Sequence, residues 1–219
     1  MQNKVNVVIP VKKLSGSKQR LSEVLGSDQR QILVLVMLDD IIRELKKSSL
    51  IDDIFILTED DYIIHSVAPY EVKVAKHKPG LDINEALQYY LNNFSEPSED
   101  QLLIVLPSDV PLLKHTTINS VVRKVLSSTP PIMAISPSDN NGTNCLIMYP
   151  CNLMSFHYGQ GSLQAHIYEA ASREISLIIH DSYDLKFDID TPKDLYELLK
   201  RHRSIKTSFY LNRILKNKS

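Results

Sequence analysis

An aspartate in the middle of the chain has the surroundings expected of a ligand for a hard cation. Asp109 lies between Pro107 and Pro111, shortly after the apolar run Leu102–Leu106. Five consecutive apolar residues predict a strand buried on both faces of a parallel sheet, and Pro107 ends it because proline has no amide hydrogen. Open α/β sheets bind ligands at the carboxyl ends of their strands, where a carboxylate can bind Mg²⁺. The alternative is that Asp109 only forms an Asx turn.

A second pair of carboxylates favours the metal-binding interpretation. Asp188 and Asp190 are separated by one residue, so in an extended chain their side chains point to the same side. Two negative charges that close together are unfavourable unless a cation lies beside them. Thr191, Pro192 and Asp194 then have the residue types of a helix N-terminus. The sequence therefore predicts a metal site made of this pair and the mid-chain aspartate.

A loop rich in cations follows the first predicted strand, Val5–Val11. Lys12, Lys18 and Arg20 are spread among small turn residues in this loop. Backbone amides and positive charges in a flexible loop form a suitable cradle for phosphate oxygens. The loop lacks the glycine and lysine spacing of a Walker loop. The alternative is a solvated basic loop with no ligand.

A pair of glycines near the middle of the second half of the chain indicates a possible anion site. Gly159 and Gly161 precede a predicted helix over Gln164–Ala171, which Ser162 is placed to cap. The free amides and dipole of a helix start attract anions, although such glycines often serve only to turn the chain. His166, one turn into this helix, is interpreted as a core or surface residue, not as a catalytic group.

Two residues near the start of another predicted helix have groups that suit a nucleobase. Gly80 permits close approach of backbone to a flat ligand, and Asn84 offers both an amide donor and an acceptor. Asp82 and Glu85 have the spacing of a capping box. A purely structural cap therefore explains this stretch equally well.

Apolar strands that alternate with amphipathic helices predict an α/β fold, a three-layer sandwich with a mostly parallel, Rossmann-like central sheet. The predicted strands are Val5–Val11, Ile51–Leu57, Glu71–Ala75, Leu102–Leu106, Ile132–Ile135, Cys145–Tyr149 and Ile175–His180. The predicted helices run over 28–47 after Ser27 as cap, from Asp82 to about 94, from Thr116 or Thr117 to about 127, over 164–171, and from 192 to about 200.

Composition narrows the class of protein. A length of 219 residues, 43% hydrophobic and 23% charged, predicts one globular domain over 1–219, with a basic C-terminal tail from about residue 201. Phe209, Tyr210, Leu211 and Ile214 in that tail can dock on the body or on a second subunit. The net charge of −1 argues against a nucleic-acid partner. The absence of a long apolar run and of a signal peptide, with only two cysteines, predicts a cytoplasmic protein without membrane contact.

Together these stretches predict nucleotidyl transfer. The basic loop can hold triphosphate oxygens, and the separated carboxylates can bind Mg²⁺ beside them, which neutralises charge as pyrophosphate leaves. An acceptor that is already an anionic phosphate needs orientation but no general base. Thr143 and the segment 159–162 can supply anion-binding amides for it.

The same stretches resemble the 2-phospho-L-lactate guanylyltransferase family, nucleotidyltransferases of the glycosyltransferase-A type. The resemblance covers nearly the whole chain up to Leu199 in the same order. The matching motifs are Ile9-Pro10-Val11-Lys12, Lys18-x-Arg20-Leu21, Gly80-Leu81 with Asn84-Glu85-Ala86-Leu87, Leu106-Pro107-Ser108-Asp109-Val110-Pro111, Asn141-Gly142-Thr143-Asn144, Gly159-Gln160-Gly161-Ser162 and Asp188-x-Asp190-Thr191-Pro192.

The resemblance implies transfer of GMP from GTP to 2-phospho-L-lactate, or to phosphoenolpyruvate, in deazaflavin coenzyme biosynthesis. It implies a homodimer that passes its product to a downstream transferase, and a nucleotide-diphospho-sugar transferase-like fold. Carried onto this sequence, it makes Asp109, Asp188 and Asp190 the Mg²⁺ ligands and gives Lys12, Lys18, Asp109 and Asp190 catalytic roles. The implied nucleotide contacts are Pro10, Val11, Lys12, Lys18, Arg20, Pro79, Gly80, Asn84, Pro107 and Ser108. The implied acceptor-phosphate contacts are Thr143, Gly159 and Ser162.

Three other functions fit parts of the pattern. Another nucleotidyltransferase, with a molybdopterin or sugar phosphate as acceptor, would use the same groups. A glycosyltransferase would also use an Asp-x-Asp motif, but the three loop cations favour a triphosphate donor. A non-catalytic nucleotide-binding protein is disfavoured because it has no physical need for clustered negative charge.

Overall fold

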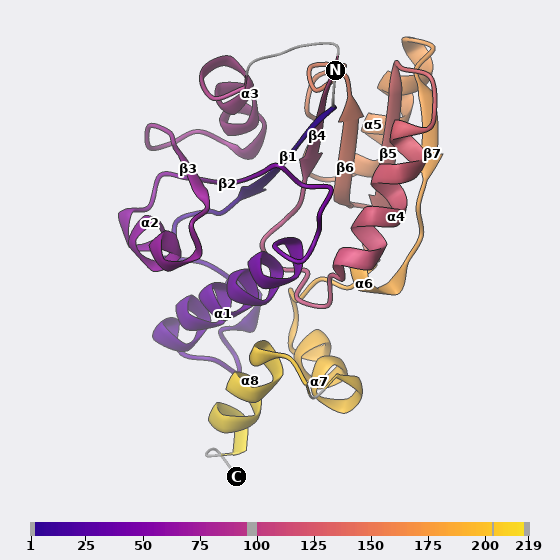
Figure 1. Ribbon diagram of the computed structural model, residues 1–219. Coiled ribbons are helices and arrows are strands. Elements are labelled where there is room, and N and C mark those ends of the chain that lie inside the picture. Colours follow the sequence, from indigo (N-terminus) through magenta and orange to yellow (C-terminus); the bar gives the residue numbers. More distant parts are fainter. Residues whose placement is uncertain (1–2, 96–99, 203, 217–219) are drawn as a thin grey trace.

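A seven-stranded sheet forms the centre of the computed structural model, which describes residues 3–95, 100–202 and 204–216 (Figure 1). The strand order is β3-β2-β1-β4-β6-β5-β7. The strands are β1 Lys4–Pro10, β2 Asp53–Thr58, β3 Lys73–Lys76, β4 Gln101–Val105, β5 Ile132–Pro137, β6 Thr143–Tyr149 and β7 Ser176–Ile179. Among these described strands only β6 runs antiparallel to its neighbours, so the predicted mostly parallel sheet is confirmed.

Helices cover both faces of the sheet, which confirms the predicted three-layer α/β fold. They are α1 Ser27–Leu45, α2 Asp61–Val67, α3 Ile83–Asn93, α4 His115–Leu126, α5 Ser162–Ser172, α6 Tyr183–Lys186, α7 Pro192–Arg201 and α8 Lys206–Lys216, with short 3-10 turns at Gln19–Leu21 and Ala68–Tyr70. Two separate apolar clusters lie between these layers. One includes residues of α1, α2, α4, α6, α7 and α8, and the other includes residues of α3 and α5.

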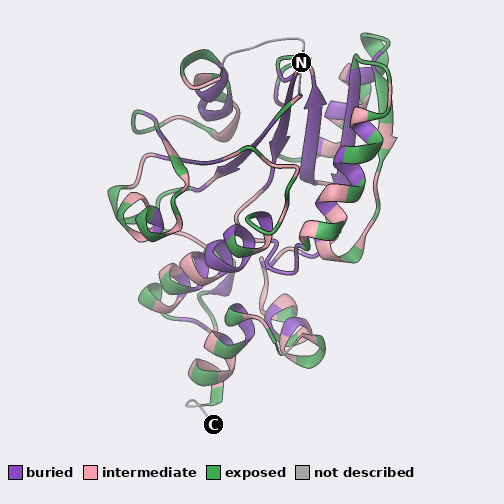
Figure 2. Ribbon diagram, in the orientation of Figure 1, coloured by how far each residue is buried: buried purple, intermediate pink, exposed green. Residues whose placement is uncertain are grey.

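The strand β4 shows why the apolar run at 102–106 is continuous. Every residue of β4 is buried, since it lies between β1 and β6 and beneath helices on both faces (Figure 2). Leu102 and Ile104 belong to one apolar cluster, while Leu103 and Val105 belong to the other. Successive side chains of a strand point to opposite faces of the sheet, so a strand that is buried on both faces needs apolar residues at every position.

Three predicted helix starts are wrong. The observed caps are Gly26 instead of Ser27, Lys114 instead of Thr116 or Thr117, and Gly161 instead of Ser162. At the first of these, the side chain of Gln29 accepts the amide hydrogen of Gly26 at 3.0 Å, so that helix begins one residue earlier. Asp82 with Glu85 forms the predicted capping box.

The C-terminal tail contains a helix, α8, that packs on the body. Leu211 of α8 is fully buried in the cluster that contains α1, and the hydroxyl of Tyr210 donates to the carbonyl of Gln29 at 2.9 Å. Asp40 of α1 accepts from the amide and hydroxyl of Thr207 at 2.8 and 2.7 Å. Of the two predicted alternatives for the tail, these contacts show docking on the body; residues 203 and 217–219 lie outside the described residues.

Within the described part of the chain, no helix is both long and apolar enough to cross a bilayer. Cys145 and Cys151 are both buried thiols. Burial raises the pKa of the Cys145 thiol to about 12, so this group stays protonated.

We expect Leu211→Ala to lower the free energy of unfolding by about 2–4 kcal/mol, because it leaves a cavity between α8 and α1. Phe209 lies on the same helix with 63% of its surface exposed, so Phe209→Ala is the matched control and should cost less than about 1 kcal/mol. Urea unfolding of both variants measures the difference. Equal losses would contradict the docking of α8 described above.

Candidate nucleotide and metal site

A cavity of about 890 Å³ opens at the carboxyl ends of β1, β2, β3 and β4. Parallel strands bring the loops that follow them to one edge of the sheet, which is why residues distant in sequence meet there. Nine of the predicted site residues line this cavity. They are Pro10, Val11, Lys12, Lys18, Arg20, Pro107, Ser108, Asp109 and Asp190.

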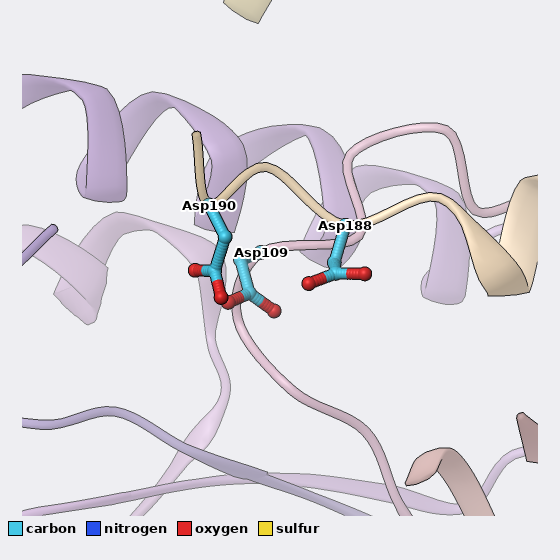
Figure 3. Close-up of side chains that lie close together, drawn as sticks. All are labelled: Asp109, Asp188 and Asp190. Carbon is cyan, nitrogen blue, oxygen red and sulfur yellow. The ribbon is translucent and has the colours of Figure 1, made fainter. Parts of the chain in front are cut away.

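Three carboxylates converge beside this cavity from two segments. Asp109 comes from the loop after β4, while Asp188 and Asp190 come from the extended segment before α7 (Figure 3). One oxygen from each lies within 4.8 Å of the others. The amide of Ile189 donates to the carbonyl of Asp109 at 3.0 Å, which joins the two segments through the backbone. The clustering predicted from the Asp-x-Asp spacing is therefore present.

A lysine of the basic loop joins two of these carboxylates. The Lys18 ammonium lies 2.6 Å from Asp109 Oδ2 and 2.6 Å from Asp190 Oδ1. The Lys18 side chain is only 11% exposed, and its backbone adopts a left-handed conformation with φ of 49°. Arg20 is further away, with its guanidinium 3.6 Å from Asp190. The loop thus brings positive charge into the centre of the acidic cluster.

Burial and neighbouring charges shift the pKa values of this cluster in opposite directions. Burial alone would lower the pKa of Lys18, but the charges of Asp109 and Asp190 outweigh it and raise that pKa. Burial would raise the pKa of Asp190, yet the Lys18 charge lowers it. Among the described residues no cation forms an ion pair with Asp188, so burial and then the charge of Asp109 raise its pKa to about 6. The cluster is therefore short of positive charge on the side of Asp188.

Asn144 holds Asp188, and the direction of β6 explains how. Because β6 is antiparallel to β4, its first residues lie at the edge where β4 ends. Asn144 is buried there, and its amide donates to the carbonyl of Lys186 at 2.9 Å and to Asp188 Oδ1 at 3.4 Å. Sequence reasoning missed this role, although Asn144 stands in one of the motifs that carry the family resemblance.

The predicted acceptor residues form a separate network beside Asn144. Ser162 donates its hydroxyl hydrogen to Thr143 Oγ1 at 3.2 Å, and His166 Nδ1 lies 3.1 Å from the same oxygen. His166 Nε2 accepts from the amide of His157 at 2.9 Å, so the neutral ring carries its hydrogen on Nδ1 and donates it to Thr143. His166 is fully buried, so of the two predicted alternatives, core or surface, the structure shows the core.

Gly159 lies in the loop between this network and α3. Its φ of +138° is a conformation that side chains rarely adopt, and the space where a Cβ would stand is open. Such a backbone leaves room for a ligand to approach. Thr143, Gly159 and Ser162 do not belong to the lining of the cavity described above.

Asn84 has a different partner from the predicted nucleobase. Its side-chain amide donates to the carbonyl of Tyr158 at 3.0 Å and its oxygen accepts from the Tyr158 amide at 2.7 Å. It therefore attaches α3 to the loop that carries Gly159. Pro79 and Gly80 also stand outside the cavity lining, while Glu59, His77, Leu81 and Ile83 are members of it that sequence reasoning did not single out.

Two solved structures of proteins named as transferases share this fold. One neighbour is a Desulfovibrio desulfuricans protein described as a nucleotide-diphospho-sugar transferase, with a TM-score of 0.75 and 17% identity, covering 99% of this chain and 98% of that one. Another is a cytidylyltransferase from Leptospira borgpetersenii, with a TM-score of 0.66 and 18% identity, covering 99% of this chain and 95% of that one. At these identities the likeness establishes the fold alone.

Sequence comparison gives the family. Residues 5–217 match the family described as guanylyl transferase CofC like, and the chain belongs to that family. A 2-phospho-L-lactate guanylyltransferase of Methanocaldococcus jannaschii is 33% identical over 208 residues, which cover 95% of this chain and 88% of the relative. The enzyme of the same name from Methanothermobacter thermautotrophicus is 28% identical over 211 residues, with 96% and 91% covered. The resemblance found in the motifs is thereby confirmed.

Because the His166 ring is buried, we expect the folded protein to lose stability in mild acid. Burial and then the neighbouring His157 lower the pKa of His166 to about 4. An unfolded chain protonates a histidine near a pH of about 6.5, so between these values the unfolded state binds more protons and gains population as pH falls. This difference in proton binding lowers the free energy of unfolding by about 2 kcal/mol between about pH 7 and pH 5.

We expect His166→Gln to show a smaller loss over that pH interval than the parent protein, measured by urea unfolding at both pH values. His65→Gln is the matched control, because His65 is exposed and its ring contacts the carbonyl of Asp61 in its own helix. An unchanged pH dependence in His166→Gln would mean that the buried ring does not stay neutral in the folded state.

Proposed function

We propose that this protein transfers GMP from GTP to the phosphate of 2-phospho-L-lactate and releases pyrophosphate. The observation that carries the proposal is the contact of Lys18 with Asp109 and Asp190 at the end of a nucleotide-sized cavity. Membership of a guanylyl transferase family supports GTP as donor. The names of the relatives support 2-phospho-L-lactate as acceptor, and phosphoenolpyruvate has the same phosphate and carboxylate groups.

The reaction needs positioning and charge neutralisation more than proton transfer. An oxygen of the acceptor phosphate attacks the α-phosphorus in line with the bond to the leaving pyrophosphate, and that bond breaks as the new one forms. The attacking oxygen is already anionic, so no general base is required. Lys12, Lys18 and Arg20 line the cavity and are placed to neutralise charge on the triphosphate as pyrophosphate departs.

The carboxylate cluster fits a magnesium ion. The three aspartates offer carboxylate oxygens within 4.8 Å of one another, and carboxylate oxygens are ligands that Mg²⁺ prefers. We therefore propose Asp109, Asp188 and Asp190 as its ligands. A bound ion supplies positive charge to the phosphate oxygens. The Lys18 ammonium at 2.6 Å from two of these carboxylates supports a site that stabilises a cation.

We assign the acceptor to the region of Thr143, Gly159 and Ser162. These residues lie beside Asn144, which binds Asp188, so an acceptor phosphate there would be next to the metal ligands. The open backbone at Gly159 supports an anion held through main-chain amides. The family resemblance further supports a homodimer in the cytoplasm whose product passes to a downstream transferase.

We expect the purified protein with Mg²⁺, GTP and 2-phospho-L-lactate to release pyrophosphate. A panel of the four nucleoside triphosphates against 2-phospho-L-lactate, phosphoenolpyruvate and a sugar phosphate measures both preferences in one assay. Turnover only with the sugar phosphate would overturn the proposed acceptor. Turnover with GTP and phosphoenolpyruvate alone would support the transfer of GMP but would make phosphoenolpyruvate the acceptor.

We expect Asp109→Asn to lower kcat/KM at least about 100-fold, because it removes a charged ligand from the site where charge develops. The substitution keeps the side-chain size, so the midpoint of urea unfolding tests whether the fold is intact. Asp28→Asn, at the exposed first turn of α1, is the matched control and should retain activity. Full activity of folded Asp109→Asn protein would refute its role as a ligand.

A further inference from the structure

Part of the cavity lining comes from β2, from the segment after β3 and from α3, and the reaction does not use its chemistry. Leu57, Leu81, Ile83 and Ala86 are its apolar members, and Glu59 is the carboxylate that follows β2. Apolar walls with a few placed polar groups are typical of a site for a flat ring. An acidic group here cannot favour phosphates, because it would repel them.

The strand order sets the distance between Glu59, after β2, and Asp109, after β4. The strand β1 lies between β2 and β4, and β1 is parallel to both. Neighbouring strands are about 4.8 Å apart, so the ends of β2 and β4 are about 10 Å from each other. Glu59 follows β2 directly and Asp109 lies in the loop after β4. A nucleotide with its phosphates at Asp109 would extend its base across β1 toward Glu59.

The Glu59 carboxylate is held in place by the turn that follows β3. Its Oε2 accepts from the amide of Gly80 at 2.9 Å, and Gly80 has φ of +87°. Among the residues that the structure describes, Oε1 makes no hydrogen bond. The nearby Asp82 also lines the cavity, but its carboxylate caps α3 by accepting from the amide of Glu85 at 2.9 Å. Glu59 caps no helix, and its Oε1 and the second lone pair of Oε2 can accept hydrogen bonds from a ligand.

We propose that Glu59 reads the nucleobase, by accepting hydrogen bonds from N1–H and the exocyclic amine of guanine. The inference rests on the proposed function, and it names the residue that makes the enzyme select GTP as its nucleotide substrate. A carboxylate only accepts hydrogen bonds, and it can accept two in parallel. Among the four common bases, only guanine presents two adjacent donors on its pairing edge. Adenine and cytosine place an acceptor next to their amine, and uracil flanks its single donor with two acceptors.

The experiment compares GTP with inosine and xanthosine triphosphates in the parent protein and in Glu59→Gln. Inosine lacks the exocyclic amine, and xanthosine has an acceptor oxygen at that position. In the variant the side-chain carbonyl can still accept from Gly80, so the turn is preserved and an amide donor faces the cavity. We expect the parent protein to prefer GTP over inosine triphosphate by about 10- to 100-fold in kcat/KM, the size of one charge-assisted hydrogen bond.

For Glu59→Gln we expect that preference to fall to within about threefold and xanthosine triphosphate to become a better donor than GTP. Glu174→Gln removes the same charge at an exposed position just after α5, outside the cavity lining, and should behave as the parent protein. A Glu59→Gln protein that keeps the parent's base preference would overturn the inference. So would a variant that loses only its preference for GTP over 2′-deoxyGTP, since Glu59 would then bind the ribose.

These results stay separate from the test of the proposed function. If the parent protein does not use GTP at all, the proposed reaction fails, and the Glu59 inference fails with it. If the parent protein uses GTP and Glu59→Gln retains its selectivity, only the inference fails. Thermal unfolding of the variant confirms that a change in selectivity is measured on folded protein.

Discussion

The salt bridge of Lys18 with Asp109 and Asp190 is the interaction on which the rest of the site depends. Its three residues are far apart in sequence, since Asp109 follows Lys18 by 91 positions and Asp190 follows it by 172. Three carboxylates within 4.8 Å would repel one another without a cation. The ammonium group offsets that repulsion and brings the basic loop against the loop after β4. The carboxylate cluster and the basic loop are therefore joined into one site.

The direction of β6 places Thr143 and Asn144 at the same edge of the sheet as the carboxylate cluster. Had β6 been parallel to β4, Thr143 and Asn144 at its start would lie at the opposite edge of the sheet. Because β6 is antiparallel, they lie where β4 ends, and Asn144 reaches Asp188. The network of Thr143, Ser162 and His166, where we propose that the acceptor binds, is thereby next to the carboxylates.

A buried polar network gives the region of Thr143, Gly159 and Ser162 its shape. Both nitrogens of His166 have partners, the hydroxyl of Thr143 and the amide of His157, and these contacts determine the tautomer. Asn84 pairs both of its amide groups with the backbone of Tyr158, so the glycine-containing loop is attached to α3. Buried polar groups that are fully paired specify a single arrangement, because any other would leave a donor or acceptor unsatisfied.

The sequence by itself determined the fold class, the succession of the strands along the chain, most of the helices, and the residue types of the basic loop and of the carboxylate cluster. These follow from apolar periodicity, from turn residues and from the Asp-x-Asp spacing, all of which are local properties. The sequence did not predict the hydrogen-bond partners of Asn84, Asn144 and His166. It also did not predict the packing of α8 on α1 or the position of Glu59 in the cavity lining. Each of these depends on contacts between segments that only strand order and direction bring together, and a single sequence carries no record of such pairings.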